Sequence, residues 1–252
     1  MGNMLAKGTF SPEDVCDWDV VRRTNPGAVI GRGKMILGVK NSELGKEHHV
    51  FKGRLVFMGN NIRKTNGVRP LGSTDGLYGQ PISLSTARLV MLAATLRGWG
   101  IEVGDVDGAY LTADLGGPPV YLRLSARLWE AAGVPPSRLS GVRGPCLRVR
   151  KAMYGLPRAG FDWFAHCDAM LVAQGWHRHS GVDSVYRKTD ALLALYVDDI
   201  VIAGTPHARR REWSLLRSAV RLRGDPEPLA RFLGVGYSVV ATGTHTRKIR
   251  AY

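Results

Sequence analysis

The chain is poor in cysteine and has no long apolar stretch, and each absence argues against a class of protein. Its three cysteines, Cys16, Cys146 and Cys167, are odd in number and far apart, which indicates reduced buried thiols and no disulfide framework. The longest apolar runs, 89–96 and 191–197, are far shorter than the roughly 18 residues that a membrane span requires. The N-terminus lacks the apolar stretch of a secretory signal peptide. We therefore expect a soluble intracellular protein, cytoplasmic or nuclear, that has no membrane partner.

Acidic residues are scarce relative to basic ones. The chain has 35 Lys and Arg against 21 Asp and Glu, which gives a formal net charge of +14 and a pI of about 10.1. So many positive charges repel one another in the compact state, and a polyanion that offsets this repulsion is therefore expected as a partner. Nucleic acid is the leading candidate, ahead of an anionic membrane or an acidic protein. A basic globular protein without such a ligand is the alternative.

The apolar pattern along the chain predicts a mixture of strands and helices, and hence an α+β fold. Tight turns between strands favour a largely antiparallel sheet backed by helices. Residues 1–28 contain two prolines and predict a poorly packed leader, and residues 60–79, rich in Gly, Asn and Thr, predict a loop. Strands are expected at 29–40, 51–59, 101–106, 120–124, 146–150, 182–188, 191–197, 200–204 and 231–240. Helices are expected at 83–98, 109–115, 159–174 and 206–223.

The clearest of these helices is the one at 83–98. Ser83 or Ser85 can cap its first turn, and Arg97-Gly98 is a typical helix end. The spacing of its apolar residues predicts a buried stripe made of Leu89, Leu92, Ala93 and Leu96.

Two adjacent carboxylates, Asp198 and Asp199, lie between two short apolar strands in the segment ALLALYVDDIVIAG. Asp is common in hairpin turns, so a simple turn is the plain interpretation. The flanking strands, however, have the pattern of strands buried on both faces. Adjacent carboxylates against apolar surface repel each other and lose hydration, which a divalent metal ion would offset. The pair is therefore a candidate metal site.

A third carboxylate, Asp105, has a similar position at the end of the strand 101–106, just before a helix. If the strands that carry Asp105 and Asp198 are neighbours, the two side chains could hold Mg²⁺ through oxygen ligands and leave room for substrate phosphates. Two such ions would activate an attacking hydroxyl and stabilise a leaving oxygen. Spacing alone does not decide the matter, because Asp107 and Asp114 are equally consistent with solvated surface groups.

Taken together, these segments resemble the copia-type retrotransposon reverse transcriptases. The catalytic turn of that family is similar to YVDD at 196–199, followed by IVIAG. Its finger strand is similar to FKGRLVFMG (51–59), and its helix, catalytic strand and next helix are similar to the stretch from YGQPISLS to DGAYLTADL (78–115). Two further segments are similar to CLRVRKAMYGLPRAGFDWF (146–164) and FLGVGYS (232–238). The resemblance covers roughly residues 29–240 in family order.

The resemblance implies a fingers-and-palm fold that catalyses RNA-directed DNA synthesis on a primer 3′-hydroxyl. The expected parts are the leader at 1–28, fingers at 29–100 and a palm at 101–252 with a fingers insertion at about 120–155; the thumb is expected to be absent or truncated. The implied partners are an RNA template, a DNA or RNA primer and deoxynucleoside triphosphates, and the implied cofactor is Mg²⁺ or Mn²⁺. No protease, integrase or ribonuclease H segment is recognised. We therefore expect a piece of a polyprotein that an intact element would carry in a virus-like particle.

The family's motifs also imply roles for single residues. By position, Asp105, Asp198 and Asp199 are the catalytic carboxylates. Asp105 and Asp198 are the implied metal ligands, whereas Asp199 supports the site more than it binds metal. Tyr110 falls where the family has an aromatic ring under the incoming sugar; an ordinary core aromatic is the alternative.

Four further residues are implied in substrate binding. Lys52 and Arg54 lie on the finger strand that would face the triphosphate, although Lys52 is equally consistent with solvated charge on an edge strand. Tyr196 would lie near the primer terminus, with a buried core tyrosine as the alternative. Arg158 stands where copia relatives usually have Gln, which puts the template-side contact in question. This departure supports a second hypothesis, a catalytically decayed or domesticated remnant that still binds nucleic acid.

Overall fold

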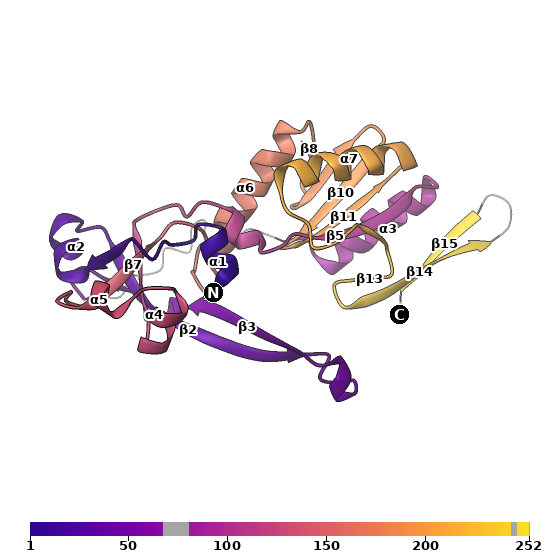
Figure 1. The fold of residues 1–252 in the computed structure, drawn as a ribbon. Coiled ribbons are helices and arrows are strands. Elements are labelled where there is room, and N and C mark those ends of the chain that lie inside the picture. Colours follow the sequence, from indigo (N-terminus) through magenta and orange to yellow (C-terminus); the bar gives the residue numbers. More distant parts are fainter. Residues whose placement is uncertain (68–80, 243–245, 252) are drawn as a thin grey trace. The chain divides into compact units, whose positions relative to one another are not determined.

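The computed structural model describes residues 1–67, 81–242 and 246–251, which form two compact units. The first unit comprises Met1–Tyr78 and Tyr110–Trp163, and the second comprises Gly79–Ala109 and Phe164–Tyr252. Each unit combines β-sheet with helices, so the predicted α+β class is confirmed (Figure 1). In the part of the chain described, no helix is long and apolar enough to cross a membrane. The division into fingers and palm stays a prediction.

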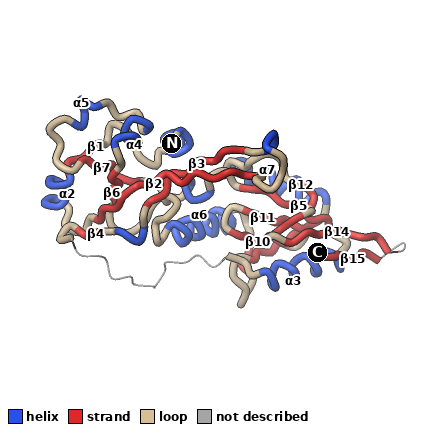
Figure 2. The backbone as a smooth tube through the Cα atoms, turned by 90° about the horizontal axis from the view of Figure 1, so that it is seen from below, coloured by secondary structure: helices blue, strands red, loops and turns tan. Residues whose placement is uncertain are grey.

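The sheet of the first unit has the strand order β1-β7-β6-β2-β3, and β4 pairs with β2 (Figure 2). The pairing of β2 with β6 is parallel, and the other pairs are antiparallel. The strands are β1 (Val15–Asp17), β2 (Val29–Lys40), β3 (Val50–Phe57), β4 (Arg63–Lys64), β6 (Val120–Arg123) and β7 (Pro145–Val149). The helices are α1 (Gly2–Ala6), α2 (Trp18–Thr24), α4 (Ala126–Ala131) and α5 (Pro136–Leu139), with 3-10 turns at Lys46–His48 and Gly59–Asn61.

The expectation of a poorly packed leader at 1–28 is wrong. β1 pairs with β7, and α2 begins on an N-cap, because the side chain of Asp17 accepts a hydrogen bond from the backbone N–H of Asp19 at 2.7 Å. The ring of Trp18 packs against that of Tyr121 with centroids 5.9 Å apart, and Phe10 is buried. The prolines that indicated loose structure are thus outweighed by large apolar side chains that enter the core.

All three cysteines are free thiols, in line with the predicted reduced state. Cys146 and Cys167 are buried, and Cys16 is half-buried opposite Cys146 across β1 and β7. Burial raises the pKa of the thiols of Cys146 and Cys167 to about 12, so both behave as apolar core residues.

The larger sheet of the second unit has the strand order β12-β5-β11-β10-β9-β8 and is antiparallel throughout its described pairs. Its strands are β5 (Gly100–Asp105), β8 (His177–Arg178), β9 (Val185–Lys188), β10 (Ala191–Tyr196), β11 (Asp199–Gly204) and β12 (Glu227–Pro228). A smaller sheet contains β13 (Arg231–Phe232), β14 (Val235–Thr242) and β15 (Thr246–Ala251). The single strand expected at 231–240 is therefore wrong, because a turn at Leu233-Gly234 divides it.

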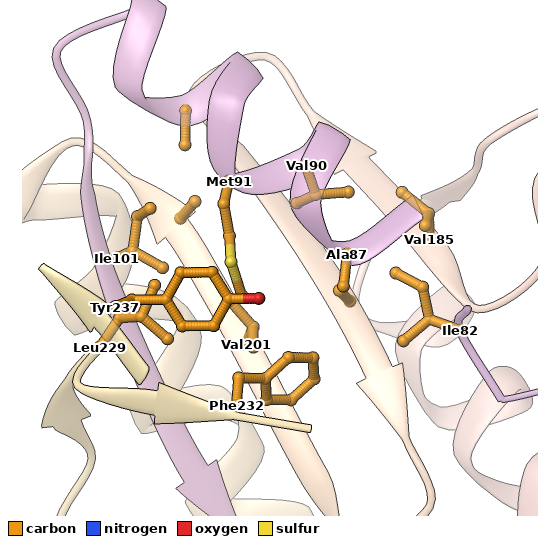
Figure 3. Close-up of a cluster of buried hydrophobic side chains, with 13 residues drawn as sticks. Ile82, Ala87, Val90, Met91, Ile101, Val185, Val201, Leu229, Phe232 and Tyr237 are labelled. Atoms are coloured by element: carbon orange, nitrogen blue, oxygen red, sulfur yellow. The ribbon is translucent and has the colours of Figure 1, made fainter. Parts of the chain in front are cut away.

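Helix α3 (Leu84–Leu96) lies along one face of the larger sheet (Figure 1), and its buried side differs from the predicted one. Ser83 is the N-cap; its hydroxyl accepts a hydrogen bond from the backbone N–H of Thr86 at 3.1 Å. The side chains that α3 buries contact residues of the sheet such as Ile101 and Val201, and Phe232 of the small sheet (Figure 3). These buried residues are Ala87, Val90, Met91, Ala94 and Thr95. The predicted stripe is exposed at three of its positions: Leu89 by 64%, Leu92 by 46% and Leu96 by 79%.

The other face of the sheet is covered by α7 (Pro206–Ala219), which ends four residues before the predicted helix end at 223. Its Trp213 packs directly on the backbone of β5, since a Cβ atom added at Gly104 would lie 2.8 Å from the indole ring. Glu212 is fully buried and forms ion pairs with Lys188 and Arg211, each at 2.7 Å. Helix α6 (Ala159–Ala173) begins in the first unit and continues in the second.

Candidate active site

Three carboxylates meet at the shared end of β5 and β11. Asp105, the last residue of β5, is the direct cross-strand partner of Asp199, the first residue of β11. Directly opposed residues project from the same face of an antiparallel pair, with Cβ atoms about 4.5–5.5 Å apart. Asp198 precedes Asp199 in the turn, and its carbonyl oxygen accepts a hydrogen bond from the N–H of Val106 at 2.8 Å. The structure therefore brings together the three carboxylates that the sequence singled out.

The turn that carries Asp198 is a two-residue hairpin loop under backbone strain. Tyr196 pairs with Asp199, so the loop consists of Val197 and Asp198, one residue earlier than predicted. Val197 has a φ of 55°, in the left-handed region that β-branched residues rarely adopt. This conformation costs about 1–2 kcal/mol. Strain of this kind gathers at functional sites. The hydrogen bond from the N–H of Val106 to the carbonyl of Asp198 holds this turn beside the end of β5.

The electrostatics of the cluster are dominated by burial and repulsion. Burial raises the pKa of Asp199 to about 6, with further upward contributions from Asp198 and Asp105 and an opposing one from Arg223. At neutral pH most Asp199 side chains are nevertheless ionised, so the three carboxylates concentrate negative charge at one end of the sheet. A cation placed there would relieve the repulsion.

Arg223 is a member of this site that sequence reasoning missed. Its Nη1 donates to Oδ2 of Asp105 at 2.8 Å, and its Nη2 lies 3.5 Å from Oδ1 of Asp107. The predicted helix 206–223 would have kept this residue on α7, but the chain leaves the helix after Ala219 and runs back along β5. The only sequence signal is the run Gly224-Asp225-Pro226, which indicates a turn just after Arg223.

A cavity of about 560 Å³ opens beside Asp199 and Tyr196. The side chain of Tyr196 is 36% exposed, so the alternative of a buried core tyrosine is wrong. The cavity is bounded by the start of α3, by the β10–β11 turn and by the β13–β14 turn. Its lining residues are Ile82, Ser83, Leu84, Tyr196, Asp199, Leu233 and Gly234.

Lys52 and Arg54 lie in the first unit, on the long hairpin of β2 and β3. Lys52 is half-buried and Arg54 is exposed. The register pairs Lys52 with Gly38 and Arg54 with Ile36, so both cations project from the same face of the hairpin. Two more cations share that face by the same register, which makes it a basic surface of Lys34, Lys40, Lys52 and Arg54.

Tyr110 also lies in the first unit, in the 3-10 helix Ala109–Thr112 that replaces the helix expected at 109–115. Its ring is half-buried and packs edge-on against Tyr154, with centroids 5.1 Å apart and planes at 67°. Aromatic pairs of this geometry hold both rings in place. Tyr110 is therefore a fixed ring, and its role under a sugar stays a prediction.

Arg158 is held at the start of α6 by an ion pair with Asp162. Its Nε and Nη2 donate to the carboxylate at 3.0 and 2.8 Å, and this hydrogen bonding raises the pKa of the guanidinium. Asp162 is buried and also accepts from the N–H of Gly116 at 3.2 Å. The guanidinium packs so closely on Gly116 and Gly117 that a Cβ atom there would lie 2.6 and 2.7 Å from it. Arg158 thus has a structural role, and the template-side contact stays a prediction.

Among residues 1–67, 81–242 and 246–251, no three or more His, Cys, Asp or Glu side chains are arranged as a metal-binding group. Arg223 engages Asp105, one of the three carboxylates at the shared end of β5 and β11.

Comparison with known proteins gives a consistent family. A family model described as "Reverse transcriptase (RNA-dependent DNA polymerase)" matches residues 17–249. The Retrovirus-related Pol polyprotein from transposon RE1 of Arabidopsis thaliana is 28% identical over 206 residues, which are 79% of this chain and 13% of that protein. The Transposon Ty1-DR4 and TyH3 Gag-Pol polyproteins of Saccharomyces cerevisiae are each 29% identical over 99 residues, 39% of this chain and 5% of each polyprotein. This chain thus spans a small part of these relatives, and it belongs to the reverse transcriptase family.

Proposed function

We propose that this chain is an RNA-directed DNA polymerase of a copia-type retrotransposon, which adds deoxynucleotides to a primer 3′-hydroxyl. The observation that carries the proposal is the meeting of Asp105, Asp198 and Asp199 at the end of β5 and β11 in a chain of this family. In this assignment the carboxylates belong to the palm and the β2–β3 hairpin belongs to the fingers.

Mg²⁺ or Mn²⁺ suits the donor set at this site. All the donors are carboxylate oxygens, which are the ligands that Mg²⁺ prefers, and the raised pKa of Asp199 reflects negative charge that a divalent cation would offset. Asp105 and Asp198 would hold the ions, and Asp199 would strengthen the negative field beside Asp105. Two ions held there would supply the activation of the attacking hydroxyl and the stabilisation of the leaving oxygen.

The other assigned residues orient substrate. Lys52 and Arg54 would contact the triphosphate, since their face of the hairpin is basic. The fixed ring of Tyr110 would lie under the sugar, and Tyr196 would contact the primer end in the cavity beside Asp199. Arg158 would act on the template side through the segment that it holds in place.

The net charge of +14 supports binding of the template and primer backbone. Neutralising phosphates releases counterions, so the affinity for a primed RNA template is expected to fall steeply between low and physiological salt, with little sequence preference. Fluorescence anisotropy with a labelled primer–template measures this. An affinity that does not change with salt would contradict the assignment of the charge to nucleic acid.

The deciding experiment is primer extension on a primed RNA template with Mg²⁺ or Mn²⁺. The protein is expected to extend the primer, D198N is expected to abolish extension, and D114N is the matched control because the side chain of Asp114 is exposed and belongs to the first unit. Salt-dependent binding without extension would support the second hypothesis, a remnant that binds nucleic acid without catalysis. Equal extension by D198N and the unaltered protein would remove the catalytic assignment.

The role of Tyr110 has its own test, in which deoxynucleotide and ribonucleotide addition are compared. A ring under the sugar clashes with a 2′-hydroxyl, so Y110V is expected to raise ribonucleotide addition while deoxynucleotide addition is largely kept. Y110F keeps the ring and is the matched control. A parallel decline of both activities in Y110V would instead indicate a core aromatic, whose removal creates a cavity.

A further inference from the structure

The backbone around Arg223 is fixed against β5, so its side chain starts from a defined place. The N–H of Arg223 donates to the carbonyl of Asp105 at 2.8 Å, and the N–H of Asp107 donates to the carbonyl of Arg221 at 2.9 Å. Between these two bonds, Val106 and Leu222 form a β-bridge. The segment 221–223 therefore extends the sheet beside the carboxylate end of β5. This backbone pairing places the side chain of Arg223 beside Asp105.

The guanidinium of Arg223 connects two carboxylates. It donates to Oδ2 of Asp105 at 2.8 Å and lies 3.5 Å from Oδ1 of Asp107 through its other terminal nitrogen. Asp105 and Asp107 flank the bridge residue Val106, and both of their carboxylates reach the same guanidinium. Arg221 is also near this pair, with its Nε 3.8 Å from Asp107. A small shift of the Arg223 head group would move it from the first carboxylate to the second.

A guanidinium on Oδ2 of Asp105 and a divalent ion bound by the same carboxylate are like charges a few ångström apart, so they compete for that carboxylate even when they occupy different lone pairs. Mg²⁺ requires its ligand oxygens at about 2.0–2.1 Å, so an ion bound by Asp105 would repel the head group of Arg223. The side chain of Arg223 is 49% exposed and that of Asp105 is 32% exposed. A pair with this much exposure is weak, so a divalent cation can displace it.

We infer that Arg223 is the exchangeable counter-ion of the catalytic carboxylates: it neutralises Asp105 before the cation arrives, and it transfers to Asp107 when the cation binds. The inference rests on the proposed function, because it takes the carboxylates as the cation site. Arg223 is a positioning residue in this scheme, since it acts through Asp105 and sets the cation concentration that the site needs. Asp107 is the acceptor that keeps the displaced guanidinium paired.

The test measures Mn²⁺ affinity of the full chain by the electron paramagnetic resonance signal of free Mn²⁺, without any substrate. R223M removes the competing charge and is expected to tighten Mn²⁺ binding by about twofold to fivefold, the size that a half-exposed ion pair implies. R221M is the matched control; it removes a cation near Asp107 that does not contact Asp105, and it is expected to change the affinity little. D107N removes the acceptor and is expected to weaken binding, and the double variant R223M/D107N is expected to lose most of that effect.

The outcomes separate this inference from the proposed function. D198N is expected to weaken Mn²⁺ binding; if it does not, the carboxylates are not the cation site and both the function and the inference fail. If D198N weakens binding but R223M binds Mn²⁺ as tightly as or less tightly than the unaltered protein, only the role of Arg223 is overturned. Circular dichroism checks that R223M is folded. If it is not, R223Q, which removes the charge but keeps a polar side chain, is expected to bind Mn²⁺ more tightly than the unaltered protein, and equal binding would overturn the inference.

Discussion

Replacing Asp199 with Asn should make the folded protein more stable at pH 8. A tenfold change in proton affinity corresponds to about 1.4 kcal/mol, so a pKa raised from the ordinary 3.8 to about 6 sets an upper bound of about 3 kcal/mol on the penalty for the charge. Asp199 is only half-buried, so solvent screens part of this penalty, and the expected gain in the free energy of unfolding is about 1–2 kcal/mol. Asp199 would thus lower the stability of the folded protein, which is expected of a carboxylate that serves function.

The gain in stability of D199N over the unaltered protein should also increase with pH. The folded protein binds the proton of Asp199 more tightly than the unfolded chain does, because its pKa is raised on folding. The stabilisation that this proton provides is fully present below pH 3.8 and is lost as the pH rises through about 6. The difference between D199N and the unaltered protein should therefore grow from pH 4.5 to pH 8.

Urea denaturation followed by tryptophan fluorescence, in buffer with a chelator, measures this difference at both pH values. D183N is the control, since the carboxylate of Asp183 is exposed and its removal should change stability little. If D199N is less stable than the unaltered protein at pH 8, Asp199 is not penalised by burial and repulsion, and the electrostatic account of the site is wrong.

Three further substitutions test the packing of α7 on β5, the hydrogen-bonded carboxylate of Asp168 and the strain of the β10–β11 turn. G104A should lower the free energy of unfolding by about 1–3 kcal/mol, because the new methyl group meets the ring of Trp213. G160A is the control, because its methyl group would enter open space and should not lower stability. Equal effects of the two substitutions in thermal unfolding would contradict the packing of α7 on β5. Asp168 accepts from Arg178 and Tyr186, which lowers its pKa, so the stability it provides should be present above pH 3.8 and be lost as the pH falls through its lowered pKa. In urea denaturation, D168N should therefore be less stable than the unaltered protein at pH 7, and its stability should fall less below pH 4. If its stability falls as much as that of the unaltered protein below pH 4, the ion pair does not contribute as described. V197N should raise the melting temperature by about 2–4 °C, because Asn tolerates the left-handed backbone conformation better than Val does. A melting temperature below that of the unaltered protein would show that the turn is not strained.

The sequence predicted the carboxylate cluster because its signals are local. Asp198 and Asp199 interrupt an apolar run so short that only a tight turn fits, and Asp105 ends a strand of the same kind. The family order then pointed to β5 and β11 as neighbours, which the register confirms. The α+β class and most element positions followed from periodicity in the same way, with ends displaced by a few residues.

Features that depend on tertiary contacts were beyond the sequence. Helix α3 is apolar on most sides, so its pattern did not show which face meets the sheet. The buried face contains the small residues Ala87 and Ala94, which allow the helix to approach closely, and the larger Leu89 and Leu96 stay outside. Arg223 was missed because its partner, Asp105, is 118 residues away along the chain. The loop expected at 60–79 lies largely outside the described residues; its first part forms a 3-10 turn and β4.

The place of β5 in its sheet has a consequence for how the protein is made. β5 lies between β11 and β12, and both neighbours are synthesised long after it. While the chain grows on the ribosome, the hairpin of β10 and β11 can form from adjacent residues, but β5 must wait for it. Asp105 and Asp199 therefore come face to face only when this distant pairing closes, a step that is intrinsically slow. Because that step also brings like charges together, cations in the surroundings should accelerate the maturation of the newly made chain.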